Sequence, residues 1–366
     1  MQTSYRLAIN GRFLTQRLTG VQRYAQEVLR ALDSILNESA WKGVSVTLFV
    51  PPKTDVSLQL SHIRIVEGGI GRGYFWEQVS LPLLARKCFL LNLCNLGPLL
   101  HTNKATIIHD AAPAAIPEAF SLSFRLAYRV LVPLVAATSR SIMTVSEFSR
   151  QEIANFYGIN SEKIIVVYAG GDHILRSKAD VGILSRLGVA KGQFFLAIGV
   201  GAKNKNLPLS LSAFSNFHTN NPNVLFVVTG NRDKNIFKEV HFTKTNGIIL
   251  AGYVSEEELR ALYEHCTALI FPSTYEGFGI PPLEAMTLGT PVIISTQPAL
   301  QEISLNSALS VNPTDSPTLE NHMQRLSHEP ALRKELQRLG FKRSQELTWK
   351  RTAKQILSTI SQIAPN

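Results

Sequence analysis

Short apolar runs rich in β-branched residues alternate along this chain with longer stretches of helical period, and this alternation limits the fold more than any other feature. The pattern is typical of parallel β-sheets covered by helices. A first series predicts strands at residues 6–9, 44–50, 63–66, 105–108, 141–145 and 164–167, and helices at 20–35, 75–86, 120–137 and 147–157. A second series predicts strands at residues 194–198, 225–229, 247–250, 269–271, 292–294 and 308–311, and helices at 207–218, 255–264, 282–286 and 317–326.

The length of 366 residues exceeds the size at which one hydrophobic core keeps growing. Hydrophobic residues make up 45% of the chain and charged residues 17%, which is enough apolar material for two cores. The boundary between the two series lies near residues 169–172, and residues 179–191 read as a connector. We expect an α/β protein of two Rossmann-like domains that face each other across a central cleft.

The cysteine count and the distribution of apolar residues indicate a cytoplasmic protein. Three cysteines, Cys88, Cys94 and Cys266, are too few and too scattered for a disulfide framework or a paired metal knuckle. The first residues do not have the pattern of a secretory signal, and the central apolar run at 130–137 is far shorter than the roughly 18 residues that span a bilayer. We therefore expect a reducing compartment and no transmembrane helix.

The formal net charge of +10 attracts anionic partners. Lys and Arg are scattered, without a basic run interleaved with aromatics or a nucleic-acid-binding motif, so we exclude nucleic acid as a partner. Arg125, Arg129 and Arg140 share a predicted helical stretch with apolar residues, namely Phe124, Leu126, Tyr128, Leu131 and Val132. Two interpretations stay open: peripheral contact with an anionic membrane, or an ordinary amphipathic helix packed on its own sheet.

Residues 271–286, which read FPSTYEGFGIPPLEAM, contain the most informative motif of the chain. A strand ends there, a loop with Gly277 and Gly279 follows, and a proline pair begins a helix. The two glycines allow the backbone to approach a ligand, and the N-terminal end of a helix favours a phosphate group. The motif predicts a site for a diphosphate.

Glu276 and Glu284 place one carboxylate on this loop and another in the opening turns of the helix. An ionised carboxylate only accepts hydrogen bonds, so it suits the paired hydroxyls of a ribose or a hexose. The alternative is a loop acid and an unrelated acid favoured by the helix dipole.

The E-x7-E spacing of Glu276 and Glu284, continued by residues 289–292, closely resembles the signature of retaining family 4 glycosyltransferases of GT-B fold, among them bacterial mannosyltransferases of polysaccharide and O-antigen synthesis. Further matching segments are residues 19–24, 76–78, 81–82, 109–110, 145–149 and 167–172. Residues 348–349 and the helical tail after them resemble the last helix of the family, which crosses back to the first domain. The resemblance implies an N-terminal acceptor-side domain (1–172), a nucleotide-sugar-binding domain (173–345) and a crossing helix (346–366).

The resemblance also assigns roles in the donor site. Glu284 would accept hydrogen bonds from the ribose hydroxyls, and Glu276 would lie beside the transferred sugar. The backbone amides of the loop would hold the sugar and the diphosphate, from Gly277, Phe278 and Gly279.

A basic loop after the strand at 194–198 is a second part of this site. Lys205 matches a phosphate-binding lysine of the family, and a positive charge there suits a departing diphosphate. The family often has an arginine where this chain has Asn204. Either Lys203 supplies the second cationic contact or the donor binds more weakly; a pair of surface lysines is the alternative.

Two candidates lie in the first domain. Gly20 stands where a strand-to-helix turn would approach the diphosphate, followed by Arg23, although a glycine before a helix is weak evidence by itself. His109 follows a buried strand and so lies at the sheet edge where ligands of α/β proteins bind. By resemblance His109 would contact the sugar, and Asp110 would orient the loop or the imidazole.

The resemblance implies a retaining hexosyltransferase with a nucleotide sugar as donor. No DxD-like metal motif stands at a strand end near these residues, and the basic loop can take the place of a metal, so we expect no metal and no other cofactor. Our first choice is mannose from GDP-mannose, transferred to a polysaccharide or a polyprenyl-diphosphate-linked oligosaccharide at the cytoplasmic face of the membrane. Three alternatives stay open: a UDP- or dTDP-sugar donor, a non-catalytic GT-B scaffold that only binds nucleotide sugars, and a sugar-nucleotide epimerase.

Overall fold

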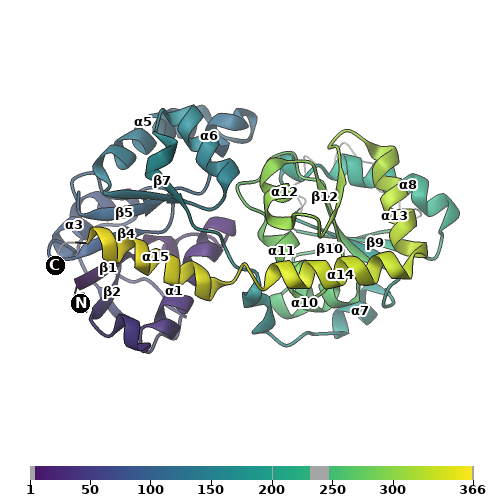
Figure 1. Ribbon diagram of the computed structural model, residues 1–366, viewed down its shortest axis with the longest axis horizontal. Coiled ribbons are helices and arrows are strands. Elements are labelled where there is room, and N and C mark those ends of the chain that lie inside the picture. The colour runs from purple at the N-terminus through teal and green to yellow at the C-terminus, as the bar shows by residue number, and fades with distance from the viewer. Residues whose placement is uncertain (1–4, 200, 231–246, 365–366) are drawn as a thin grey trace. The chain divides into compact units, whose positions relative to one another are not determined.

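The computed structural model of the protein describes residues 5–199, 201–230 and 247–364, so Val200 in the basic loop lies outside the described residues. The chain divides into two compact units, Met1–Ala169 with Trp349–Asn366 and Gly170–Thr348 (Figure 1). The domain bounds 1–172, 173–345 and 346–366 stay a prediction. Among the described residues, no helix is both long enough and apolar enough to cross a membrane.

A seven-stranded parallel sheet forms the centre of the first unit, in the order β3-β2-β1-β4-β5-β6-β7. Its strands are β1 (Tyr5–Asn10), β2 (Val44–Val50), β3 (Arg64–Glu67), β4 (Phe89–Asn92), β5 (Lys104–Ile107), β6 (Ser141–Thr144) and β7 (Ile164–Val166). The sequence pattern predicts six of them and misses β4. All four residues of β4 are buried, but none is β-branched, so the usual compositional signal of a strand is lacking.

The helices of the first unit lie between these strands in sequence, apart from the C-terminal helix, which follows the second unit. They are α1 (Gly20–Ile35), α2 (Gly73–Phe75), the π-helical turn η3 (Trp76–Ser80), α3 (Leu81–Leu84), α4 (Ala112–Ala115), α5 (Leu122–Thr138), α6 (Glu147–Tyr157) and α15 (Trp349–Ile363). The predicted helix at 75–86 is thus a composite segment, 73–84. The predicted helix at 120–137 begins later, at Leu122, because the side chain of Ser121 caps it.

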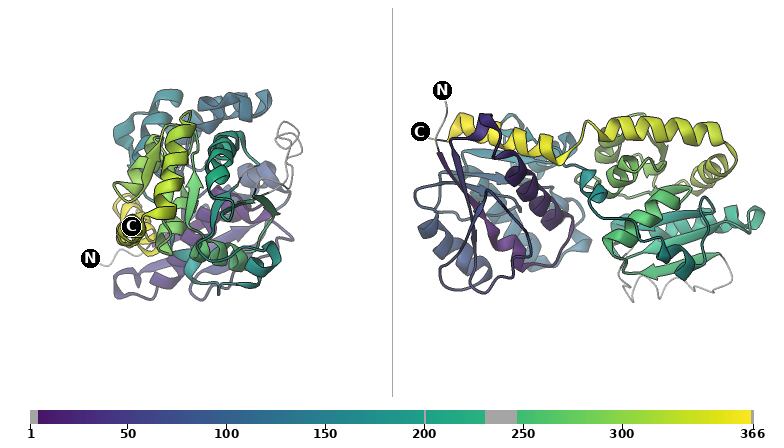
Figure 2. Two further views of the ribbon diagram at one scale, coloured as in Figure 1. Left: turned by 90° about the vertical axis from the view of Figure 1, so that its right-hand side faces the viewer. Right: turned by 90° about the horizontal axis from the view of Figure 1, so that it is seen from below.

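The C-terminal helix α15 packs along α1, as Figure 2 shows. The ring of Trp349 meets the ring of Tyr24 edge-on at 5.4 Å between centroids. Thr352 donates a hydrogen bond of 2.6 Å to the carbonyl of Tyr168. Ile356, completely buried, lies on the same side of α15. The last residues of the chain therefore complete the core of the first unit.

The second unit has a six-stranded parallel sheet in the order β10-β9-β8-β11-β12-β13. Its strands are β8 (Phe194–Ile198), β9 (Leu225–Thr229), β10 (Ile248–Gly252), β11 (Ala268–Phe271), β12 (Val292–Ser295) and β13 (Leu309–Val311), all predicted by the apolar runs. Its helical elements are η6 (Asp172–Leu175), α7 (Gly182–Leu187), η7 (Lys203–Lys205), α8 (Leu207–Asn220), α10 (Glu256–His265), α11 (Ile280–Thr287), α12 (Pro298–Ser304), α13 (Ser316–His328) and α14 (Pro330–Ser344).

Three helices of the second unit differ from the sequence analysis. The expected connector at 179–191 contains α7, which is only six residues long and ends at Gly188 in the left-handed conformation. The helices α12 and α14 are not predicted at all. Each begins with a proline, which is a signal for a helix start. The predictions above rest on the pattern of apolar residues, which does not include this signal. The expected α/β fold with two parallel sheets is confirmed.

The packing of α15 predicts the stability of the first unit. Replacing Ile356 by Ala should lower the free energy of unfolding by about 2–4 kcal/mol, because a fully buried side chain leaves a cavity. All three tryptophans, Trp41, Trp76 and Trp349, belong to this unit, so tryptophan fluorescence during denaturant unfolding measures the change. The exposed neighbour Ser358, replaced by Ala, serves as the control and should change stability little. Equal effects of the two substitutions would contradict the packing role of α15.

Candidate functional site

The loop from β11 to α11 makes a turn at Gly279 that favours glycine. This residue precedes α11 with a φ of 125°, a region that side chains other than glycine rarely adopt. A Cβ atom there would also lie 2.7 Å from the side chains of Leu300 and Ile303. Pro281 and Pro282 follow in the first turn of the helix. The backbone conformation therefore favours glycine at this turn, and a Cβ atom would in addition displace the ends of two side chains.

Two of the predicted site residues, Lys205 and Glu276, meet in the second unit. The Nζ atom of Lys205 lies 2.5 Å from Oε1 of Glu276 and 4.6 Å from the centre of the Phe271 ring. The side chains are 19% and 13% exposed, so this ion pair is accessible to a ligand. Gln297 donates a hydrogen bond of 3.1 Å to the carbonyl of Glu276 and fixes the loop from its other side.

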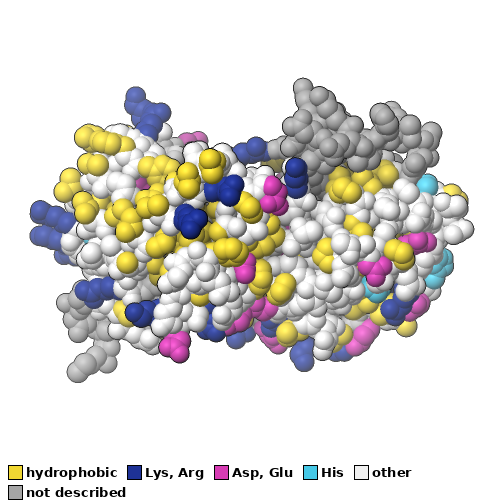
Figure 3. All heavy atoms as spheres, turned by 90° about the horizontal axis from the view of Figure 1, so that it is seen from above, with side chains coloured by type: hydrophobic (Ala, Val, Ile, Leu, Met, Phe, Trp, Pro, Cys, Tyr) yellow, Lys and Arg dark blue, Asp and Glu magenta, His cyan; other side chains and the backbone are white. Residues whose placement is uncertain are grey.

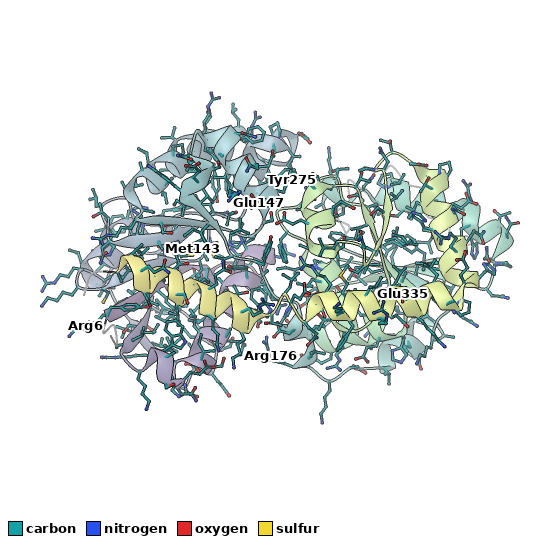
Figure 4. The ribbon with its side chains drawn as sticks, in the orientation of Figure 1. Arg6, Met143, Glu147, Arg176, Tyr275 and Glu335 are labelled. Atoms are coloured by element: carbon teal, nitrogen blue, oxygen red, sulfur yellow. The ribbon has the colours of Figure 1, made fainter. Side chains whose placement is uncertain are left out.

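Asn204, where the family often has arginine, joins the two loops. Its Nδ2 atom donates to the carbonyl of Tyr275 at 2.9 Å, and its own carbonyl accepts from the N–H of Thr274 at 2.8 Å. Tyr275 is labelled in Figure 4 on the loop that precedes α11. The next residue but one, Asn206, donates to the carbonyls of Pro272 and Pro313. Lys203, in contrast, is exposed.

Glu284 lies in α11 and is almost completely buried, with 7% of its surface exposed. Its Oε1 atom lies 2.7 Å from Nε2 of His173, and its Oε2 atom accepts a hydrogen bond of 2.7 Å from the hydroxyl of Tyr263. Burial and the neighbouring carboxylate raise the pKa of Tyr263 well above its usual value, so this hydroxyl keeps its proton. Sequence reasoning missed both partners, because a histidine after a glycine pair and a tyrosine in a helix carry no distinct signal.

His109 lies in the first unit, directly beyond the end of β5. The ring Nε2 atom is 2.8 Å from the carbonyl of Leu93, and the backbone N–H donates to the side chain of Asn95 at 2.8 Å. Burial lowers the pKa of His109 to about 4. The imidazole is therefore neutral near pH 7, with its proton on Nε2 and Nδ1 as the acceptor. Asp110 accepts from the N–H of Ala112 at 2.9 Å, which orients the loop.

Gly20 is the first residue of α1 and is exposed. A Cβ atom added there would meet nothing within 4 Å, so packing inside the protein does not require glycine at this position. Arg23, one turn further along α1, lies 4.0 Å from the carboxylate of Glu27.

A polar cluster at the ends of β1 and β4 was not singled out by the sequence analysis. The buried side chains of Arg12 and Glu77 form an ion pair at 2.9 Å, and Asn10 donates to Glu77 at 2.6 Å and to Asn92 at 3.0 Å. The guanidinium of Arg12 also lies 4.3 Å from the centre of the Tyr74 ring. Because a buried ion pair is costly to desolvate, the hydrogen bonds from Asn10 matter for its stability. The cluster fastens η3, which contains Glu77, to the sheet edge.

Within the described parts of the chain, no group of three or more His, Cys, Asp or Glu side chains is placed to hold a metal ion. The candidate donor-site residues Lys203, Lys205, Gly277, Phe278, Gly279, Glu276 and Glu284 all belong to the second unit, and Gly20 and His109 belong to the first.

The buried neutral state of His109 predicts an acid-dependent loss of stability. Below pH 6.5 the unfolded chain binds a proton at this imidazole while the folded chain does so only near pH 4. The contribution of His109 to the free energy of unfolding therefore has its full value above pH 6.5. Below pH 6.5 it falls by about 1.4 kcal/mol for each pH unit, roughly 3 kcal/mol in all.

The variant His109→Gln, which keeps an N–H donor for the Leu93 carbonyl, should lose this part of the pH dependence. Tryptophan-detected unfolding of both proteins between pH 4 and pH 7.5 measures it. Parallel curves for the wild type and the variant would contradict a depressed pKa at His109.

Part of the chain is similar to known proteins. Residues 186–343 match the family described as Glycosyl transferases group 1. The chain is 31% identical over 239 residues to the O-antigen chain mannosyltransferase RfbU of Salmonella typhimurium, covering 64% of this chain and 63% of that protein. It is 28% identical over 229 residues to O-antigen chain mannosyltransferase B of Escherichia coli, covering 60% of each. The matches thus span about six-tenths of the length of these relatives.

Solved structures agree on the fold. Anabaena HepE in complex with UDP and glucose superposes with a TM-score of 0.75 at 18% identity, over 98% of this chain and all of that one. WaaG, a glycosyltransferase involved in lipopolysaccharide biosynthesis, gives 0.71 at 14% identity, over 97% and 99% of the two chains. Residues 186–343 therefore match a glycosyl transferases group 1 domain, and the chain has the fold of these solved structures.

Proposed function

We propose that this protein is a retaining glycosyltransferase that moves a hexose from a nucleotide sugar to a polysaccharide or lipid-linked oligosaccharide. The observation that carries the proposal is the accessible pair of Lys205 and Glu276 beside the glycine turn, within a glycosyl transferases group 1 domain. The two relatives named above are mannosyltransferases, which favours mannose from GDP-mannose as the donor. HepE was solved with UDP and glucose, so a UDP-sugar is the alternative donor.

Glu284 is proposed to receive the ribose. Its Oε1 atom lies beside Nε2 of His173 and its Oε2 atom accepts from the hydroxyl of Tyr263, and an oxygen of a carboxylate can accept more than one hydrogen bond. The two partners leave the carboxylate little freedom to rotate, so a ribose diol would meet a fixed pair of acceptors. Holding the acceptor group in place before binding lowers the entropic cost of the contact.

The diphosphate is proposed to lie between the two loops. The amides of Gly277, Phe278 and Gly279 at the start of α11 would bind it together with Lys205, and the exposed Lys203 would add a second positive charge. To reach the diphosphate, Lys205 turns from Glu276 toward the ligand or contacts both. The released carboxylate of Glu276 then lies beside the sugar.

For the chemistry we propose front-face attack. The bond between the anomeric carbon and the diphosphate oxygen breaks through an oxocarbenium-like transition state, while the acceptor oxygen bonds to the same face and gives its proton to the departing diphosphate. Lys205 and the loop amides stabilise the growing negative charge of the diphosphate. His109, neutral and with Nδ1 as an acceptor, would bind a sugar hydroxyl, and Gly20 would allow α1 to approach the diphosphate.

The acceptor side is proposed to be the first unit, with the segments 69–75 and 111–122 between its strands as the parts that would select the acceptor. A polyprenyl-diphosphate-linked oligosaccharide suits the net charge of +10. Such an acceptor would place the reaction at the cytoplasmic face of a membrane.

The competing hypothesis is a non-catalytic scaffold that binds nucleotide sugars. Its motivation is Asn204 in place of arginine. Hydrolysis of the donor without acceptor separates the two, because a pure binder releases no sugar. An epimerase would instead convert one free nucleotide sugar into another.

Nucleotide binding tests the donor site. In calorimetry with GDP, UDP and dTDP, with and without EDTA, we expect selective binding of GDP that needs no metal and that Glu284→Ala weakens at least tenfold. The control is Glu335→Ala, which replaces an exposed acidic residue of α14 labelled in Figure 4. This variant should bind GDP as the wild type does. Absence of binding by every nucleotide would reject the donor site.

Turnover tests the role of the basic loop. Lys205→Ala should lower the rate of sugar transfer by about a hundredfold or more while the fold survives, because a positive charge opposite the leaving diphosphate is lost. Glu276→Ala should also lower turnover. Lys191→Ala, at an exposed position of the same unit, is the matched control. If Lys205→Ala and Lys191→Ala transferred sugar equally well, the assignment of Lys205 would be wrong.

A further inference from the structure

The helix α5 exposes a stripe of large apolar side chains. Leu122, Leu126, Val130 and Leu134 follow one another at intervals of four residues, and they are 65%, 54%, 59% and 44% exposed. Residues four apart lie on the same side of a helix. The outer side of a helix in a water-soluble fold is normally polar, so this stripe requires an explanation.

The neighbouring segment 73–84 continues the apolar surface. Phe75, Val79 and Leu83 are also four residues apart and are 56%, 43% and 70% exposed. Gln78 holds this segment on the 97–99 turn through hydrogen bonds with Gly97 and Leu99. Leu99 in turn packs in the same core cluster as α5 residues, which makes the two helical segments neighbours on one face of the unit.

Cations outnumber acidic residues around this apolar surface, although α6 contributes Glu147 and Glu152 and the exposed Glu118 precedes α5. The helix α5 has no acidic residue, and Arg129 is exposed on it beside the partly exposed Arg125. Exposed cations of the flanking segments are Arg72, Arg86, Lys87 and Arg140. Figure 3 shows hydrophobic side chains gathered over the first unit with Lys and Arg among them.

A groove of about 310 Å³ between α5 and α6 adds a specific feature. Arg125 and Arg129 line it together with the apolar side chains of Leu126 and Phe156. Phe156 is itself 46% exposed. Two guanidinium groups beside an apolar wall match the chemistry of a phospholipid, in which a phosphate is joined to an acyl chain.

We propose that α5, α6 and the segment 73–84 form a surface that docks on an anionic lipid bilayer, with a headgroup phosphate in the groove between Arg125 and Arg129. The apolar stripes enter the boundary between headgroups and acyl chains, and the surrounding cations bind anionic lipids. This inference goes beyond the proposed transfer reaction and does not depend on the donor site. A bilayer fits better than an acidic protein, because the apolar side chains stand on convex helix surfaces rather than in one deep pocket.

Co-sedimentation with lipid vesicles tests the proposal. The full chain should bind vesicles of phosphatidylcholine with one-third phosphatidylglycerol, and should bind pure phosphatidylcholine vesicles much more weakly. The double variant R125Q/R129Q should bind the anionic vesicles about 25-fold more weakly, from about fivefold for each arginine. The variant L126S/V130S should bind about tenfold more weakly.

The controls lie on α14 of the second unit. K334Q/K342Q removes two positive charges, as R125Q/R129Q does, and F341S removes an exposed apolar side chain. These controls should bind like the wild type. Equal losses in the variants of α5 and α14 would overturn the proposal, as would full binding by R125Q/R129Q or no binding by the wild type. Nucleotide calorimetry on the same variants is independent of vesicle binding, so failure of this surface and failure of the donor site are distinguishable.

Discussion

The pairing of β11 with β8 is the constraint on which the candidate site depends. Parallel neighbours release their loops at the same edge of the sheet, so the basic loop after β8 and the glycine loop after β11 meet although Lys205 and Glu276 are 71 residues apart in sequence. The hydrogen bonds of Asn204 then fix the loops to each other. Without this strand order the lysine and the glutamate would have no reason to be close.

The two glutamates of the motif are held in physically different ways. Glu284 is 7% exposed and receives hydrogen bonds from groups that are themselves buried, so its position is set before any ligand arrives. Glu276 is paired with a lysine at a partly exposed position, where solvent weakens the attraction between the charges. The first arrangement suits a binding group that should not move. The second suits a pair whose lysine exchanges one anion for another.

The strands and the loops of the site could largely be predicted from the sequence. Parallel strands buried on both faces appear as continuous apolar runs, and turns that need glycine or proline are marked by these residues. The sequence pattern misses β4, whose phenylalanine and leucines are equally common in helices. It also misses His173 and Tyr263, because their importance comes only from contact with Glu284. Tyr263 fits the apolar side of α10 and therefore reads as an ordinary core residue. Apolar periodicity predicts burial, but it does not predict which buried hydroxyl finds a carboxylate.

Asn204 bears on whether the chain is an active enzyme or only a scaffold. An arginine at this position would bring one more positive charge, but its longer side chain could not make the short bond from Nδ2 to the Tyr275 carbonyl. The asparagine gives up that charge and fastens the loop that carries Glu276. Lys203 and Lys205 remain on the same turn, so the proposed diphosphate site keeps two cations. The replacement therefore exchanges one contribution to the site for another, and it is a weak argument for loss of catalysis.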